Sequence, residues 1–258
     1  MSLNQPIREW RGKRVWVIGA SSGIGAALAR VLLVQGARVA LSARSAPGLA
    51  QIAATPGART LVLPLDVTDA AAVAPALQQV VAAWGGIDLV VWCAGSHHPV
   101  RAWELDAADA RRLVDVNLNG VINGVPAVVK QLLLQNAGGM AIVSSVAGYG
   151  GLPTALVYGA TKAALSNLAE TLYLDLAPRG IAVYLINPGF VKTPLTDRNT
   201  FKMPALISAD EAAQEIIAGF ARGSFEIHFP RRFTLCLKLL RLLPYRWYFA
   251  LVHKGTGL

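Results

Sequence analysis

Cysteine is scarce in this chain, with only Cys93 and Cys236 among 258 residues. Two isolated cysteines exclude the disulfide framework of small secreted proteins, and they indicate either a reduced compartment or buried apolar side chains. The first ten residues, MSLNQPIREW, also lack the apolar core followed by small residues that marks a secretory leader. The sequence therefore predicts a cytoplasmic protein.

Charged side chains are few, at 15% of residues against 54% hydrophobic ones. This balance excludes global disorder and predicts one large buried interior, which a chain of this length can form as a single domain. No internal repeat, low-complexity tract or Pro/Ser-rich linker divides the sequence. The formal net charge is nevertheless +9, and basic residues crowd the end of the chain at Arg231, Arg232, Lys238, Arg241, Arg246 and Lys254. This distribution indicates a local feature at the C-terminus.

Short apolar runs alternate with longer Ala- and Leu-rich stretches, a pattern typical of βαβ units with a parallel sheet covered on both faces. The expected strands span 14–18, 38–42, 60–65, 89–93, 140–144, 182–187 and 225–229. The expected helices span 24–35, 47–55, 70–84, 108–135 (as one helix or two pieces), 156–176 and 209–222. The prediction is an α/β fold, a single doubly wound, Rossmann-like parallel sheet of seven strands in residues 1–230, with 231–258 as a C-terminal helical extension of the same domain.

A glycine-rich loop, Gly19-Ala20-Ser21-Ser22-Gly23-Ile24-Gly25, follows the first expected strand and opens the first helix. Gly19 permits the tight turn, Gly23 lets the backbone approach a pyrophosphate, and Gly25 lets the helix pack on the strand. The free N–H groups and the dipole of the helix start favour phosphate. In this context the loop predicts a dinucleotide site, with an ordinary Gly-rich turn as the alternative.

The end of the second expected strand bears on the choice of cofactor. An NAD enzyme usually offers an acidic residue there for the ribose 2′-OH, whereas this chain reads Ser42-Ala43-Arg44-Ser45, with no carboxylate until Asp66. The Arg44 guanidinium can bind a 2′-phosphate in a forked geometry, and the hydroxyls of Ser21, Ser22 and Ser45 can add contacts. The sequence thus favours NADP, unless Arg44 is a solvated loop charge.

Tyr158 and Lys162 stand four residues apart in an expected helix, so their side chains share one face. A free tyrosine has a pKa of about 10, but a nearby ammonium and an oxidised nicotinamide favour the phenolate and bring the pKa towards neutrality. Tyr158 is therefore predicted to be the acid/base, with Ser145 holding the substrate oxygen as charge develops. Taken singly, Tyr158 and Lys162 also fit a core-edge aromatic and a solvated charge, and Ser145 fits a turn cap.

Asn117 and Ser145 lie between the two motifs, with Ser145 thirteen residues before Tyr158. In this order and spacing the chain resembles the short-chain dehydrogenase/reductase family from about residue 12 to about residue 229. The resemblance implies that Asn117 anchors a water beside Lys162, although Asn117 also suits a bond to loop backbone. It further implies cofactor contacts along the chain at Asp66, Val67, Gly95, Pro188, Gly189 and Thr193.

Two positions depart from the family pattern. Ile18 stands where the first motif commonly has Thr, and Trp92-Cys93-Ala94-Gly95 stands where the family commonly has Asn-Asn-Ala-Gly. Both changes bear on scaffolding contacts near the expected cofactor. His97 and His98 follow Gly95 and suit a solvated loop better than substrate contact. The remaining histidines and carboxylates have no spacing suited to a metal, so none is expected.

Residues 194–207 have no clear period and are predicted to form a substrate lid. Beyond them, residues 231–244 read as an apolar helix with Lys238 and Arg241 on one stripe, ended or kinked by Pro244 before residues 245–252. The charges and the proline interrupt any membrane-spanning run. Residues 231–252 suit a helix in a membrane interface, or one packed on its own domain or on a second subunit.

These observations predict an NADP-dependent carbonyl reductase or alcohol dehydrogenase acting on an apolar, lipid-like small molecule. A homodimer or homotetramer is expected, and peripheral membrane contact through residues 231–252 is one option. The rival hypothesis is a non-catalytic NADP-binding or membrane-associated interaction protein, whose expected mark, a broken Tyr/Lys pair, is absent. Nucleic-acid binding is not expected, because the basic residues are interleaved with leucines.

Overall fold

The computed structural model describes residues 2–54, 59–199, 201 and 203–257. Seven parallel strands form one sheet in the order β3-β2-β1-β4-β5-β6-β7. They are β1 (Arg14–Ile18), β2 (Arg38–Ser42), β3 (Arg59–Val62), β4 (Leu89–Trp92), β5 (Gly139–Val143), β6 (Ala182–Pro188) and β7 (Glu226–Phe229). The order reverses between β1 and β4, which opens a crevice at their carboxyl ends. The predicted doubly wound sheet is confirmed.

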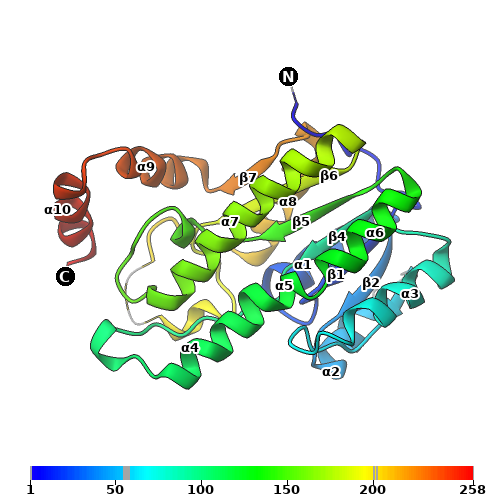
Figure 1. The fold of residues 1–258 in the computed structure, drawn as a ribbon, viewed down its shortest axis with the longest axis horizontal. Coiled ribbons are helices and arrows are strands. Elements are labelled where there is room, and N and C mark those ends of the chain that lie inside the picture. The colour runs from blue at the N-terminus through cyan, green and yellow to red at the C-terminus, as the bar shows by residue number, and fades with distance from the viewer. Residues whose placement is uncertain (1, 55–58, 200, 202, 258) are drawn as a thin grey trace.

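Helices cover both faces of this sheet (Figure 1). They are α1 (Gly23–Val34), α2 (Ala46–Ala53), α3 (Val73–Trp84), α4 (Ala107–Val114), α5 (Gly120–Ile122), α6 (Val125–Gln135), α7 (Leu156–Leu176), α8 (Ala209–Arg222), α9 (Arg231–Arg241) and α10 (Tyr245–Thr256). One core packs the sheet against α1, α2 and α8, and the other packs it against α3, α6 and α7. Val15 and Val17 enter the first core while Trp16 and Ile18 enter the second, which is why the strand is apolar throughout.

Several element boundaries differ from the predicted ones. β3 ends at Val62 rather than at residue 65, although the N–H groups of Leu63 and Leu65 still donate to the carbonyls of Leu41 and Ala43. α3 begins at Val73 rather than at residue 70, since the Asp69 carboxylate accepts the N–H of Ala71 in a turn. The end of the second predicted helix, at Thr55, lies outside the described residues.

The predicted helix over 108–135 is more broken than expected. After α4 the chain forms a π-helical turn at Asp115–Asn119, then the short α5, and α6 starts only at Val125. The break before α6 is fixed by Asn123, whose Nδ2 donates to the carbonyl of Val67 at 2.9 Å. π-helical turns are often found at functional sites, and this one carries Asn117.

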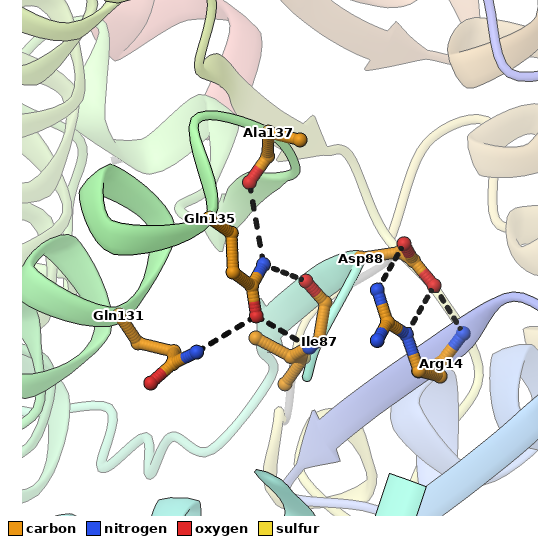
Figure 2. Close-up of polar contacts among 6 residues, drawn as sticks. All are labelled: Arg14, Ile87, Asp88, Gln131, Gln135 and Ala137. Atoms are coloured by element: carbon orange, nitrogen blue, oxygen red, sulfur yellow. Dashed lines mark hydrogen bonds and ion pairs between the residues drawn. The ribbon is translucent and has the colours of Figure 1, made fainter. Parts of the chain in front are cut away.

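Polar contacts hold the end of the sheet where the strands begin, opposite their carboxyl ends (Figure 2). The Arg14 guanidinium forms a forked pair with the Asp88 carboxylate at 2.9 Å for both bonds, and the Arg14 backbone N–H donates to the same carboxylate at 2.7 Å. The Gln135 amide closes α6 onto the backbone of Ile87, with contacts of 2.9 and 2.7 Å. These bonds join the starts of β1 and β4 to α6 and so hold the frame on which the crevice is built.

The C-terminal extension forms two helices, α9 and α10, with the predicted interruption at Pro244 between them. α9 stops at Arg241, and Pro244 is the residue that precedes α10. Figure 1 shows both helices, coloured orange to red, beyond β7 at one end of the molecule. No helix within the described residues is both long and apolar enough to span a bilayer.

Candidate active site

A cleft of about 360 Å³ lies among the loops that follow β1, β2, β4, β5 and β6. Almost all residues predicted to form the cofactor and catalytic sites line this cleft, although they come from nearly every part of the sheet. Those on its wall are Gly19, Ser21, Ser22, Gly23, Ile24, Gly25, Arg44, Ser45, Asp66, Val67, Gly95, Ser145, Tyr158, Lys162, Pro188, Gly189 and Thr193. Asn117 is the exception.

The N-terminus of α1 opens onto one end of the cleft. The Ser22 side chain does not cap this helix, so the first N–H groups stay available. Gly23 has a φ of +55°, and a Cβ there would come within 3.1 Å of Thr193 on the opposite wall. A Cβ on Gly25 would lie 2.2 Å from the carbonyl oxygen of Gly19, so Gly25 is needed for the turn to pack on the helix. The geometry leaves a narrow backbone cradle with helix-dipole polarity, which fits an anionic group.

Arg44 lies exposed on the cleft wall after β2, near Asp66. The Asp66 carboxylate accepts hydrogen bonds from the backbone N–H and the hydroxyl of Thr68, and these bonds, helped by the charge of Arg44, hold the pKa of Asp66 below its usual range. No ion pair within 4.0 Å engages Arg44 among the described residues. Its guanidinium is therefore free to meet an anion at this end of the cleft.

Ser145, Tyr158 and Lys162 converge where β5 meets α7. The Lys162 ammonium donates to the carbonyl of Val143 at 2.9 Å and lies 5.6 Å from the centre of the Tyr158 ring. The neighbouring Ser144 hydroxyl donates to the Lys162 carbonyl at 2.7 Å, which ties the end of β5 to α7. Ser145 begins the next turn, where its hydroxyl accepts the N–H of Ala147 at 3.1 Å. The turn cap is thus real, and it fixes the Ser145 hydroxyl beside Tyr158.

Burial governs the protonation of this cluster. It raises the pKa of Tyr158, which a hydrogen bond from the Ser145 hydroxyl partly offsets. It also lowers the pKa of Lys162 to about 8, against the opposing influence of Cys93, and raises the pKa of Cys93 to about 12. In the protein alone, Tyr158 is a protonated phenol at neutral pH beside a largely charged lysine. The expected lowering of the Tyr158 pKa therefore requires an additional positive charge in the cleft.

Asn117 lies behind the cleft wall and is fully buried. Its Oδ1 accepts the N–H of Ser96 at 2.7 Å, and its Nδ2 donates to the Ser96 carbonyl at 2.9 Å and to the Thr161 hydroxyl at 3.2 Å. The amide therefore makes the bond to loop backbone that was the alternative for this residue. A Cβ on Gly95 would lie 3.4 Å from Asn117 Oδ1 and 3.7 Å from Lys162 Nζ, so Asn117 still supports the loop that passes over Lys162.

His97, which the sequence placed in a solvated loop, is buried instead. Its ring lies 4.4 Å from the Tyr158 ring, centre to centre, and its Nε2 lies 3.1 Å from Oδ1 of Asn199. Asn199 belongs to the predicted lid, whose described residues include a 3₁₀ turn at Thr196–Arg198 and a bridge from Ile207 to Val191; residues 200 and 202 lie outside the described ones. His98 is exposed, as expected. The position of His97 just past the carboxyl end of β4 is the signal that could have identified it.

A second polar cluster joins the catalytic loop to the C-terminal extension. Glu226 on β7 accepts the Tyr149 hydroxyl at 2.6 Å and Asn187 Nδ2 at 2.8 Å, and it also pairs with the ammonium of Lys238 on α9. Burial would raise the pKa of Glu226, but the bonds from Lys238, Tyr149 and Asn187 hold it below its usual range. Tyr149 lies four residues after Ser145, and Asn187 immediately precedes Pro188. No sequence motif predicted this cluster.

No group of three or more His, Cys, Asp or Glu side chains in the described parts of the chain is placed to hold a metal ion. The cleft brings together a phenol, a hydroxyl and an ammonium with the uncapped N-terminus of α1.

A family model described as short chain dehydrogenase matches residues 13–203. An uncharacterized oxidoreductase of Myxococcus xanthus is 36% identical over 231 residues, which cover 88% of this chain and 91% of the relative. A protein of Mycobacterium bovis named 3-alpha-(or 20-beta)-hydroxysteroid dehydrogenase is 34% identical over 186 residues, which cover 72% of each chain.

Solved structures show the same similarity. A crystal structure of a short chain dehydrogenase/reductase from Burkholderia phymatum, in complex with NAD, superposes with a TM-score of 0.83 at 27% identity. The superposition covers 90% of this chain and 94% of the other. The overall fold is thus shared with a protein whose crystal structure is a complex with NAD.

Proposed function

The chain belongs to the short-chain dehydrogenase/reductase family, and we propose that it is an NADP-dependent oxidoreductase that reduces an apolar, lipid-like carbonyl compound or oxidises the corresponding alcohol. The observation that carries the proposal is the convergence of Ser145, Tyr158 and Lys162 at one cleft whose far end is the uncapped N-terminus of α1. One end of the cleft suits an anion, and the other suits proton transfer.

The residues of the cleft fit a nicotinamide dinucleotide phosphate. The backbone cradle at Gly23 would hold the pyrophosphate against the start of α1, because a side chain at this position would fill the space. Arg44 would bind the 2′-phosphate, since it lies exposed on the wall with no carboxylate on its own loop. The segment of Pro188, Gly189 and Thr193 would face the nicotinamide. The bound nicotinamide supplies the hydride donor or acceptor.

The side chains of this protein would manage the proton and the substrate oxygen. Tyr158 would donate its hydroxyl proton to the substrate oxygen, and burial, which keeps the phenol protonated at neutral pH, favours reduction. The Ser145 hydroxyl would hold that oxygen by a hydrogen bond as negative charge develops. Lys162 would stabilise the phenolate left behind, since its ammonium lies one helical turn from Tyr158. Asn117 would hold the loop over Lys162, the place where the family resemblance puts a proton-relay water.

Apolar side chains near the mouth of the cleft support an apolar substrate. Val191, Pro194 and Leu195 line its wall, and Phe190 packs edge-on against Phe201 of the predicted lid at 5.8 Å between ring centres. The relative from Mycobacterium bovis is named for a hydroxysteroid, a largely apolar secondary alcohol. The predicted homodimer or homotetramer stays a prediction, which light scattering will test.

The experiment is a cofactor-oxidation screen with NADPH and NADH in parallel, across ketones of increasing apolar size that include a steroid ketone. We expect turnover that favours NADPH and larger apolar ketones. A preference for NADH would refute the cofactor assignment alone. Cofactor binding by calorimetry without turnover of any ketone would instead favour the non-catalytic alternative.

A further inference from the structure

The C-terminal extension exposes an apolar face that no described part of the chain covers. Eight of the nineteen large apolar side chains exposed in the described residues lie between residues 235 and 251. Leu235 and Leu239 on α9 and Leu242 at its C-cap form one stripe at helical spacing, with exposed fractions of 49%, 65% and 80%. On α10, Trp247 and Leu251 form a second stripe, 61% and 47% exposed. We call these five residues the outward face.

Two basic residues of α9, Lys238 and Arg241, contact other parts of the protein. Lys238 pairs with Glu226 on β7, and the Arg241 guanidinium lies over the rings of Tyr245 and Tyr248, 5.3 and 5.9 Å from their centres. Lys238 and Arg241 lie three residues apart and share one stripe of α9, as predicted, and this stripe faces the loop of Tyr149 and Gly150. These contacts, with the Tyr248 hydroxyl donating to the Gly151 carbonyl at 2.7 Å, hold the extension so that its leucines point outward.

The charge around the outward face indicates which kind of surface it binds. Residues 227–258 contain six Lys or Arg residues and no Asp or Glu. Arg231, Arg232, Arg246 and Lys254 are exposed on the same two helices as the outward face. A two-fold contact between copies would place the same surface against itself and so bring cations against cations. An anionic surface would instead attract all four.

We propose that the outward face docks on the surface of an anionic lipid bilayer. Leucines with an exposed tryptophan, bordered by Arg and Lys, match a helix that lies in the interface with its apolar side among the acyl chains. α9 has 11 residues and α10 has 12, so each lies along the membrane and neither spans it. Docking involves only the extension and so stands apart from the proposed enzymatic activity.

The extension also contacts Phe190, a neighbour in sequence of residues that line the cleft. Docking would therefore bear on how the substrate reaches the cleft. Phe233 of α9 packs on Phe190 at 5.8 Å between ring centres, and Phe190 in turn contacts Phe201 of the predicted lid. Leu235, Leu239 and Leu242 lie on the side of α9 opposite Phe233, so a bilayer under the outward face would lie across α9 from these rings. The consequence, that lipid-dissolved substrate enters from the α9 side of the molecule, rests on the proposed function.

The test is co-sedimentation of the full-length protein with vesicles of phosphatidylcholine alone and with vesicles that also contain phosphatidylserine. We expect binding to the anionic vesicles only, with a loss of about tenfold or more when salt rises from ~0.1 M to ~1 M, where the screening length falls from about 10 Å to 3 Å. The variant Leu239→Gln/Leu242→Gln should lose anionic binding, and so should Arg232→Gln/Arg246→Gln/Lys254→Gln.

The matched control is Leu134→Gln/Leu174→Gln, which changes two leucines exposed to 70% and 72% on α6 and α7. It should bind like the unmodified protein, and thermal melting should show that all variants fold. Absence of vesicle binding, equal binding to both vesicle types, or equal loss in the control would overturn the proposal. If the protein ignores vesicles and Leu239→Gln/Leu242→Gln yields a smaller species in light scattering, the outward face is a contact between copies. Because no ketone or cofactor is present, the result is independent of the enzymatic proposal.

Discussion

The imidazole of His97 lies against the phenol ring of Tyr158, with ring centres 4.4 Å apart and planes tilted by 58°. The same imidazole reaches Asn199 at 3.1 Å, and because Asn199 offers an oxygen there, the bond requires the proton on Nε2. His97 thus connects the proposed acid/base to the segment predicted to close over the substrate. Both contacts arise from residues far apart in the sequence.

Replacing His97 should separate these two contacts. His97→Phe keeps a ring against Tyr158 but removes the bond to Asn199, and we expect KM for the ketone to rise about fivefold, the scale of one lost hydrogen bond of about 1 kcal/mol. Asn199→Ala should raise KM by the same factor. His97→Ala also removes the ring from Tyr158, so it should raise KM and lower kcat. Steady-state kinetics of the variants measures both constants. Exposed His98→Ala is the control, and unchanged kinetics in all three variants would remove His97 from the site.

Tyr158→Phe should abolish most turnover while leaving cofactor binding intact. Removing a positioned proton donor costs about 100-fold or more in kcat. The measurement is NADPH oxidation with the best ketone, beside NADPH affinity by calorimetry. Tyr173→Phe is a matched control on the same helix, since its hydroxyl binds the Leu3 carbonyl far from the cleft. Turnover near that of the control would show that Tyr158 is not the acid/base.

Arg44→Ala should weaken NADPH binding selectively. The lost charge-assisted contact corresponds to about 1.5–3 kcal/mol, whereas NADH, which has no 2′-phosphate, should bind nearly as before. Isothermal titration with both cofactors measures the difference. Arg30→Ala, an exposed arginine on α1, removes the same charge away from the cleft wall. Equal losses for the two cofactors would contradict a 2′-phosphate contact.

Asp88→Asn should lower the free energy of unfolding by about 1.5–3 kcal/mol at neutral pH, because it breaks the charged bonds from Arg14 (Figure 2). Burial would raise the pKa of Asp88, but the bonds from Arg14 outweigh burial and hold that pKa below its usual range. The pair therefore stabilises the protein fully above the unfolded-state pKa of about 3.9 and loses its effect as pH falls through the lower native value.

Urea unfolding at several pH values tests this. The difference between Asp88→Asn and the unmodified protein should shrink in acid, while exposed Asp175→Asn should change little at any pH. A difference that stays constant below about pH 4 would mean that the Asp88 charge is not its source.

The sequence by itself determined the parallel sheet, the glycine loop after β1 and the facing of Tyr158 and Lys162. Each depends on local rules: apolar runs form strands covered on both faces, glycine permits a positive φ, and residues four apart share a helix face. The family assignment followed from the order of the same motifs and is confirmed. The π-helical turn at Asn117 was missed because a helical period does not reveal one extra residue in a turn.

Only the tertiary structure decided the surroundings of these residues. His97 looks like a polar loop residue in sequence, yet the approach of α7 and the 194–207 segment buries it against Tyr158. In sequence Lys238 looks like a surface charge among leucines. In the structure it forms an ion pair with Glu226 on β7, and the neighbouring leucines are exposed. In both cases the deciding partner is distant along the chain or on another element, so the free energy of the contact exists only once the sheet has formed.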